Sequence, residues 1–161
     1  MDLTNQMLIA TKSSKIDISL EKNTESISKR FSNLIRKGDI IYFYGEVGVG
    51  KTTFIKYLIN NLQRKNNSEE TEVASPTFSI VNEYLINDNL IYHYDLYRVK
   101  NIDELNNIGF LEDFNKSISL IEWPELLYKK IDNKIDLFFE YDDSFNSRYL
   151  TIKSDSKKIN L

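Results

Sequence analysis

The first half of the chain alternates between strand-like and helix-like spacing of its hydrophobic residues. Residues 15–20 place apolar side chains at every second position, as in a half-buried strand. From about Asn23, taken as the N-cap, apolar residues recur along one face of a helix that Gly38 and the basic residues before it are expected to close. Residues 39–44 are almost continuously apolar, which favours a strand buried on both faces. A second amphipathic helix is predicted over residues 51–62.

The second half of the chain predicts shorter elements and more strands. The expected elements are strands at 78–85 and 90–97 that form a hairpin, a helix at 103–115 interrupted at Gly109, a strand at 117–121, a short helix opened by Pro124, and strands at 135–141 and 148–153. Together the two halves predict an α/β fold. We expect a mainly parallel sheet with helices on both faces, and some antiparallel strands from the hairpin and the C-terminal pair.

The composition is that of a globular protein and excludes several kinds of chemistry. With 161 residues, the chain is long enough for one domain with a sizeable core. We expect this domain at residues 15–154, with residues 1–14 as a flexible arm and residues 155–161 as a polar tail. The absence of Cys excludes disulfides and thiolate metal sites, and a single His excludes His-rich metal sites.

Net charge and hydropathy indicate which partners the protein contacts and where it is located. The formal net charge of −3 argues against a basic nucleic-acid clamp, so any RNA contact would need a local patch or a partner. No segment approaches the roughly 20 apolar residues of a membrane span, and the N-terminal apolar run is too short for a signal peptide. We therefore expect a cytoplasmic protein without membrane contact.

One glycine-rich segment separates the buried strand from the second helix. Residues 45–52 read G-E-V-G-V-G-K-T, which matches the phosphate-binding pattern G-x-x-x-x-G-K-[ST] in the strand–loop–helix context that it requires. Lys51 would reach the β- and γ-phosphates, and the Thr52 hydroxyl would ligate Mg²⁺. A turn without a ligand would not need all four fixed positions, so we predict a P-loop nucleotide site. The residues expected to contact the nucleotide here are Val47, Gly48, Val49, Gly50, Lys51, Thr52 and Thr53.

A P-loop also needs an acidic group at the end of a nearby strand, and two candidates exist. Glu122 ends a short apolar strand, and Asp95 lies near the end of the second hairpin strand. Both positions suit an open α/β sheet, which binds ligands at the carboxyl ends of its strands. On spacing alone, Glu122 is equally compatible with a surface carboxylate, and Asp95 with a helix cap or a partner of Arg98.

Two further features invite functional interpretations that the sequence does not favour. Residues 133–136 read N-K-I-D, like the guanine-specificity signature of GTPases, but they follow a polar segment and the companion D-x-x-G element is absent. We therefore interpret them as a chance match. His93 is a possible general base, but a strand histidine fixed by a hydrogen bond is the preferred interpretation.

Five blocks of sequence stand out along the chain: the phosphate loop at 45–53, S-P-T-F-S-I-V at 75–81, H-Y-D-L-Y-R at 93–98, the E-L…G…E stretch at 104–112, and I-E-W-P-E at 121–125. In this order they resemble the blocks of the TsaE family, small bacterial ATPases in tRNA threonylcarbamoyladenosine biosynthesis. A phosphate loop alone is shared by many unrelated proteins, whereas the H-x-D-x-Y-R and E-W-P blocks in this order are specific. The resemblance extends from about residue 16 to residue 148.

The resemblance implies catalytic roles for several residues. Lys51 and Thr52 match the phosphate lysine and the Mg²⁺ ligand, and Glu122 matches an acidic residue of the metal site. Asp95 matches an acid that positions metal or water. Thr77 matches a switch-like segment that would sense the γ-phosphate.

Further positions match the family at the nucleotide itself. Trp123 matches a tryptophan near the nucleotide or a partner, with core packing as the alternative. Glu21 lies where the family's N-terminal segment approaches the adenine, and Arg148 matches a late arginine near the nucleotide. Val47 and Val49 stand where the family more often has Leu and Ala, at positions that contribute backbone N–H groups.

The function that the resemblance implies is that of an accessory ATPase. It would use ATP and Mg²⁺, assemble with TsaB and TsaD homologues, and support repeated turnover by TsaD, the enzyme that modifies tRNA. Contact with tRNA would be indirect. Hydrolysis without the partners would be slow, since no arginine finger is evident in the chain. The alternatives are a stand-alone small-molecule kinase, which would need a lid segment that we do not find, and a binding module switched by nucleotide.

Overall fold

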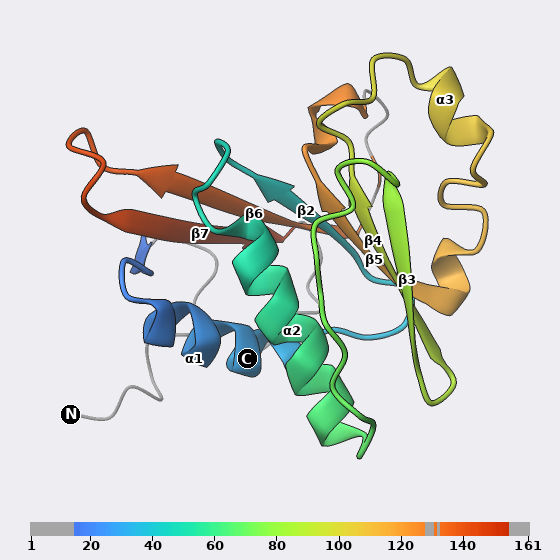
Figure 1. The fold of residues 1–161 in the computed structure, drawn as a ribbon, viewed down its shortest axis with the longest axis horizontal. Helices are drawn as coiled ribbons and strands as arrows, with labels where there is room; N and C mark the ends of the chain where they lie inside the picture. Colours follow the sequence, from blue (N-terminus) through green and yellow to red (C-terminus); the bar gives the residue numbers. More distant parts are fainter. Residues whose placement is uncertain (1–14, 128–130, 132, 155–161) are drawn as a thin grey trace.

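A computed structural model describes residues 15–127, 131 and 133–154 (Figure 1). The expected N-terminal arm and the C-terminal tail lie outside the described residues. The elements, in chain order, are β1 (Ile16–Asp17), α1 (Glu21–Ser32), β2 (Ile40–Tyr44), α2 (Lys51–Lys65), β3 (Val81–Ile86), β4 (Asn89–Asp95), α3 (Asp103–Asn106), η2 (Phe114–Lys116), β5 (Ser117–Glu122), η3 (Pro124–Leu126), β6 (Lys134–Tyr141) and β7 (Arg148–Ser154).

The strands form one mixed sheet with a parallel centre. Its order is β1-β7-β6-β2-β5-β4-β3. Strands β6, β2, β5 and β4 run parallel to one another, and the hairpins β3–β4 and β6–β7 and the short β1–β7 pair add antiparallel edges. The α/β fold with a parallel centre and antiparallel additions, expected from the sequence, is thereby confirmed. The carboxyl ends of β2, β5 and β4 lie together, which is where such sheets bind ligands.

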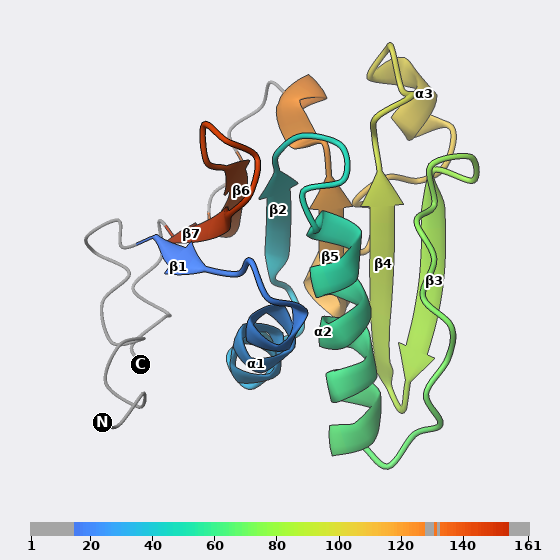
Figure 2. The same ribbon diagram turned by 60° about the vertical axis from the view of Figure 1, so that its left-hand side comes forward.

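Strand β2 divides its side chains between the two faces of the sheet, as expected for a strand buried on both sides. Ile41 and Phe43 belong to a core beneath α1 and α2, whereas Ile40 and Tyr42 belong to a second core on the other face. Both long helices cover the same face (Figure 2). The other face is packed by side chains of residues 96–127, whose helices are only short turns. Helices were expected on both faces, but the long helices cover only one face and the other carries short helical turns.

Helix α1 differs from the sequence prediction at both of its ends. Helix α1 begins at Glu21 after Leu20, so Asn23 lies inside the helix and is not its N-cap. The helix ends at Ser32, and Gly38 (φ +92°) instead turns the chain into β2, where its N–H donates to Ser117 O at 2.7 Å.

Only four residues of the segment expected as a helix at 103–115 are α-helical, those of α3. Gly109 and Leu111 have φ of +66° and +60°, which the α-helix does not allow. The helix expected at Pro124 is the single 3₁₀ turn η3. Within the described part of the chain, no helix is both long and apolar enough to cross a membrane.

Candidate functional site

The glycine-rich segment forms a tight loop between β2 and α2. Gly45, Gly48 and Gly50 have φ of +140°, +78° and +114°, in the region that residues with a side chain avoid. Gly50 is the N-cap of α2, so the first N–H groups of the helix open onto the loop. Val47 is 67% exposed at the tip, whereas the Val49 side chain is fully buried in the core. Val49 therefore anchors the loop in the core.

Lys51, the first residue of α2, is buried within this loop. Its Nζ donates to Gly45 O at 2.5 Å and to Glu46 O at 2.9 Å, and it lies 4.1 Å from the centroid of the Trp123 ring. Burial lowers the pKa of Lys51, although the carboxylates of Glu122 and Asp95 oppose this shift. The partners of the Lys51 ammonium are thus two carbonyl oxygens and an aromatic ring, none of which is charged. Such a cation is suited to exchanging the carbonyl oxygens for an anionic ligand.

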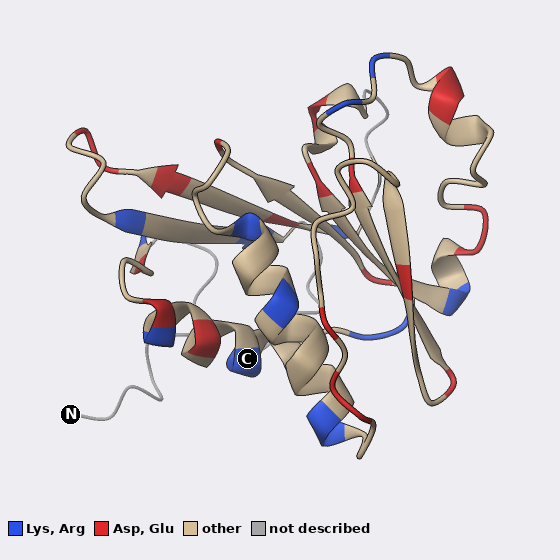
Figure 3. Cartoon of the chain, in the orientation of Figure 1, with Lys and Arg blue, Asp and Glu red and all other residues tan. Residues whose placement is uncertain are grey.

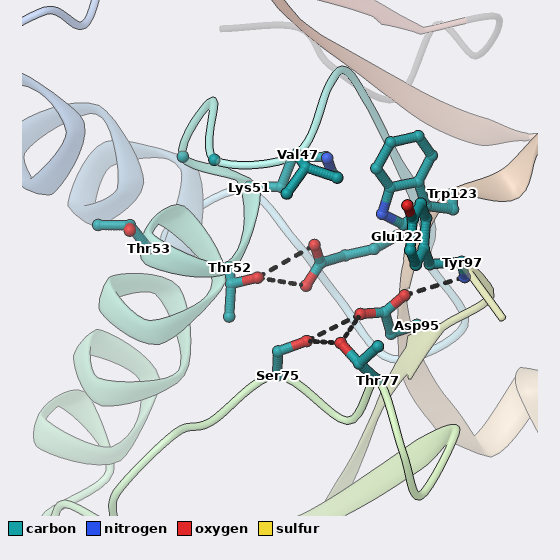
Figure 4. Close-up of a pocket in the computed structure, with 12 residues that line it drawn as sticks. Val47, Lys51, Thr52, Thr53, Ser75, Thr77, Asp95, Tyr97, Glu122 and Trp123 are labelled. Atoms are coloured by element: carbon teal, nitrogen blue, oxygen red, sulfur yellow. Dashed lines mark hydrogen bonds between the residues drawn. The ribbon is translucent and has the colours of Figure 1, made fainter.

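Glu122 lies at the carboxyl end of β5, next to the N-terminus of α2. The Thr52 hydroxyl donates to it, at 2.8 Å from Oε1 and 3.1 Å from Oε2 (Figure 4). His93 Nε2 lies 2.9 Å from Oε1, and both His93 and Glu122 are almost fully buried. Glu122 is therefore a fixed acid within the site and not the surface carboxylate that spacing alone allowed. His93 has the expected hydrogen bond in a strand, and its partner is Glu122.

Asp95 occupies the matching position on the neighbouring strand, since β4 and β5 align it with Glu122. Its Oδ2 accepts hydrogen bonds from Ser75 Oγ at 2.8 Å and Thr77 Oγ1 at 2.7 Å, and its Oδ1 accepts one from Tyr97 N at 3.0 Å (Figure 4). The acid thus ties the segment after α2 to the end of β4. Arg98, the partner considered from the sequence, lies instead over the ring of Phe78, 4.8 Å from its centroid.

These groups surround one pocket of about 340 Å³ at the carboxyl end of the sheet. The residues that line it are Val47, Gly48, Gly50, Lys51, Thr52, Thr53, Ser75, Thr77, Asp95, Tyr97, Glu122 and Trp123. Ten of these were candidates from the sequence. Ser75 and Tyr97 were not singled out, although both lie in blocks that carry the family resemblance, two residues before Thr77 and two after Asp95. Trp123 faces the pocket with its ring 4.9 Å from that of Tyr97, so it is not a plain core residue.

Glu21 and Arg148 lie in a second pocket, of about 270 Å³, on the other side of the phosphate loop. Gly50 and Thr53 line both pockets, and Val49 lines the second. Glu21 Oε1 accepts a hydrogen bond from Tyr57 Oη at 2.6 Å, which raises the pKa of Tyr57 to about 12. Because β1 pairs with β7, Glu21 at the start of α1 and Arg148 at the start of β7 line the same pocket beside the phosphate loop.

The donor set fits a magnesium ion that is shared with phosphate. Nowhere in the described residues do three His, Cys, Asp or Glu side chains gather as a metal cage. Mg²⁺ commonly uses one or two carboxylates, waters and substrate phosphates in place of such a cage. The Thr52 hydroxyl and the Glu122 carboxylate, already in contact at the helix N-terminus, are suitable ligands of this kind.

The N-K-I-D segment lies at the other end of the sheet. Lys134 begins β6 and pairs with Ile40 at the start of β2, whereas the phosphate loop follows the end of β2. Lys134 forms an ion pair with Asp136 of the same segment. This placement agrees with interpreting the segment as a chance match.

A buried parallel strand, a glycine loop and a helix that begins at the lysine of that loop together define the P-loop class of α/β proteins. The family model described as "Threonylcarbamoyl adenosine biosynthesis protein TsaE" matches residues 18–150. The chain belongs to the TsaE family.

Individual relatives agree with this assignment. Proteins named tRNA threonylcarbamoyladenosine biosynthesis protein TsaE are similar to the chain in Rickettsia typhi (37% identity over 66% of the chain and 72% of the relative), Haemophilus influenzae (34% over 73% and 77%) and Aquifex aeolicus (37% over 65% and 72%). The crystal structure of Bacillus subtilis YdiB has the same fold, with a TM-score of 0.69, 23% identity, and coverage of 91% of this chain and 88% of that one.

Proposed function

We propose that the protein binds ATP with Mg²⁺ and hydrolyses it slowly, as an accessory subunit in the biosynthesis of threonylcarbamoyladenosine in tRNA. The observation that carries this proposal is the contact between Thr52 and Glu122 beneath the phosphate loop, 2.8 Å long. It places a hydroxyl and a carboxylate together at the N-terminus of α2, next to the Lys51 cation. P-loop NTPases hydrolyse a phosphoanhydride with these three kinds of group.

The phosphates would be held by the loop and its lysine. The N–H groups at the start of α2 and the glycine loop favour anionic oxygens. Lys51 would exchange the carbonyls of Gly45 and Glu46 for phosphate oxygens, which regains charge pairing for a buried cation. Bound Mg²⁺, held by Thr52 and Glu122, would neutralise charge that develops on the phosphoryl group.

The remaining groups of the pocket suit orientation of the attacking water. Asp95 is buried and accepts hydrogen bonds from two hydroxyl groups, those of Ser75 and Thr77. A hydroxyl that donates its single proton to Asp95 can still accept a hydrogen bond from water, and it would donate to a phosphate oxygen by giving up its bond to Asp95. Thr77 would then respond to the γ-phosphate, as expected of a switch-like segment.

The base of the nucleotide would occupy the second pocket, since Gly50 and Thr53 connect it to the first. Glu21 and Arg148 offer an acceptor and a donor there. In this arrangement the phosphates and the base lie on opposite sides of the N-terminus of α2.

Assembly with TsaB and TsaD homologues is supported by the family and by the names of the relatives. The charged residues of α2 are all basic (Figure 3), but Lys51 is buried in the phosphate loop and Arg64 forms an ion pair with Glu70. With a net charge of −3, the chain lacks the basic character that tight binding of tRNA requires. Contact with tRNA through the partners is therefore the simpler proposal.

The test is ATP turnover by the purified chain, alone and with its own TsaB and TsaD. Lys51→Ala is expected to lower turnover about 100-fold or more, because the charge that stabilises the transferred phosphoryl group is lost. Lys56→Ala, an exposed lysine of the same helix, is the matched control and should behave like the wild type. The single tryptophan, Trp123, lies against Lys51, so its fluorescence is expected to change when nucleotide binds.

Turnover that is slow alone and faster with the partners would support the proposal. Fast turnover with no effect of the partners would favour an independent enzyme, for which a phosphoryl acceptor would then be sought. Nucleotide binding without any consumption of ATP would favour the binding module.

A further inference from the structure

His93 is a buried polar residue for which the proposed hydrolysis provides no direct role. It lies on β4 with 0% of its surface exposed, and its Nε2 is 2.9 Å from Glu122 Oε1. Its other ring nitrogen, Nδ1, is buried and has no hydrogen-bond partner among the described residues. A carboxylate only accepts hydrogen bonds, so the contact requires the proton on Nε2 and makes no demand on Nδ1. Among the described residues, the hydrogen bond to Glu122 is therefore the polar contact that holds the imidazole in place.

The register of the sheet explains why His93 meets this acid. Strands β4 and β5 pair in parallel, with His93 beside Leu120 and Asp95 beside Glu122. Side chains two residues apart share a face, so His93, Asp95 and Glu122 all point toward the face that α2 covers. Strand β4 thus carries both His93, which contacts Glu122, and Asp95, which accepts the hydroxyl hydrogen bonds described above.

The carboxylate of Glu122 has two hydrogen-bond partners, which belong to different elements. Thr52 Oγ1 contacts both of its oxygens from α2, and His93 Nε2 contacts Oε1 from β4. If the Thr52 oxygen bound a metal ion, it would do so through a lone pair and keep its proton, but the hydroxyl would reorient and the geometry of its bond to Glu122 would change. The bond from His93 would then be the one that keeps the carboxylate in orientation.

We propose that His93 is a positioning residue that aims the Glu122 carboxylate at the Thr52 hydroxyl and thereby sets the affinity of the nucleotide site for Mg²⁺. The inference rests on the proposed function, because it needs a divalent ion at Thr52 and Glu122. Partners of this kind, which orient a ligating group without touching the metal, typically change metal affinity about 10–100-fold when they are removed.

Three substitutions separate positioning from packing. His93→Leu has a similar size and no donor. His93→Gln places an amide donor near the position of Nε2, whereas His93→Asn places its amide near that of Nδ1, which has no partner to meet. Ser119→Ala is the matched control, since it removes another buried polar group without a partner among the described residues, from the strand that carries Glu122.

The experiment is a titration of each full-length variant with MgCl₂ at fixed ADP, followed by Trp123 fluorescence, together with thermal unfolding without nucleotide. His93→Leu and His93→Asn should need about 10-fold or more Mg²⁺ for half-maximal binding, and His93→Gln should restore most of the loss. Ser119→Ala should match the wild type. In turnover assays at saturating ATP, the loss in the Leu and Asn variants should shrink as Mg²⁺ is raised.

The possible failures are distinct. If the wild type binds ADP with a clear dependence on Mg²⁺, and folded His93→Asn shows the same dependence, the positioning role is overturned while the proposed function stands. The same conclusion holds if the variants differ in unfolding temperature alone. If the wild type itself binds nucleotide independently of Mg²⁺, the proposed metal site is overturned, and the role of His93 with it.

Discussion

Replacing Gly45 with alanine tests how the phosphate loop is held against the C-terminal hairpin. Gly45 has φ of +140°, and an added Cβ would lie 2.5 Å from Phe139 O and 3.0 Å from both Phe139 Cβ and Val49 Cγ1. The carbonyl belongs to β6 and cannot move aside as the end of a flexible side chain does. Gly50 supplies the matched control, because its φ is also positive, at +114°, while nothing lies within 4 Å of an added Cβ.

The two variants are expected to lose different amounts of stability. Backbone strain costs about 1–3 kcal/mol in either variant. The steric clash adds about 1–3 kcal/mol in Gly45→Ala alone, as at other overpacked sites. At about 2–4 °C for each kcal/mol in a chain of this size, Gly45→Ala should unfold about 2–12 °C below Gly50→Ala.

Thermal unfolding without nucleotide, followed by circular dichroism, measures this difference. Equal midpoints would refute the argument that contact with β6 makes glycine necessary at position 45. Nucleotide binding gives an independent second readout. Gly50 lines the proposed phosphate pocket, so Gly50→Ala should weaken ADP binding even at a temperature where the variant is fully folded.

Two further predictions concern the charged groups of the site. Glu122→Gln should lower ATP turnover about 10–100-fold while leaving most Mg²⁺-free binding of ADP, and unchanged turnover in a steady-state assay would contradict the assignment of this acid to the metal site. Lys51→Met should raise the unfolding temperature of the nucleotide-free protein, because burial lowers the pKa of Lys51 and so penalises its charged form in the folded state. This gain in unfolding temperature should be fully present below the folded-state pKa of Lys51 and should shrink as the pH rises from there toward the unfolded value of 10.5. Thermal unfolding curves at several pH values measure it. A gain that stays constant over this range would contradict the reasoning.

Local patterns were sufficient to predict the central part of the fold and of the site. The apolar run at 39–44 and the glycine loop after it identify the buried strand and the phosphate loop, because both are encoded by consecutive residues. Glu122 was recognised as a candidate because it ends an apolar run. Lys51 and Thr52 follow from the motif itself.

Other features depend on contacts between distant parts of the chain and were not predictable from spacing. The bond between His93 and Glu122 exists only in the register that joins β4 to β5. The start of α1 at Glu21 was not predictable from spacing because Leu20 is a weak capping residue, and residues 18–20 alone separate the helix from β1. The helix expected over residues 103–115 stops early, since its apolar side chains pack onto the second core from turns.

Because β1 pairs with β7, the proposed nucleotide site combines residues that are far apart in the sequence. Ile16 and Asp17 lie beside Leu150 and Tyr149, so the pocket of Glu21 and Arg148 joins residues from the beginning and the end of the described chain to Val49, Gly50 and Thr53. The groups proposed for hydrolysis all come from residues 45–123. If the base occupies the second pocket as proposed, mutations near the two ends would alter the preference for a base without touching the proposed hydrolytic groups, and the two properties would be able to evolve separately.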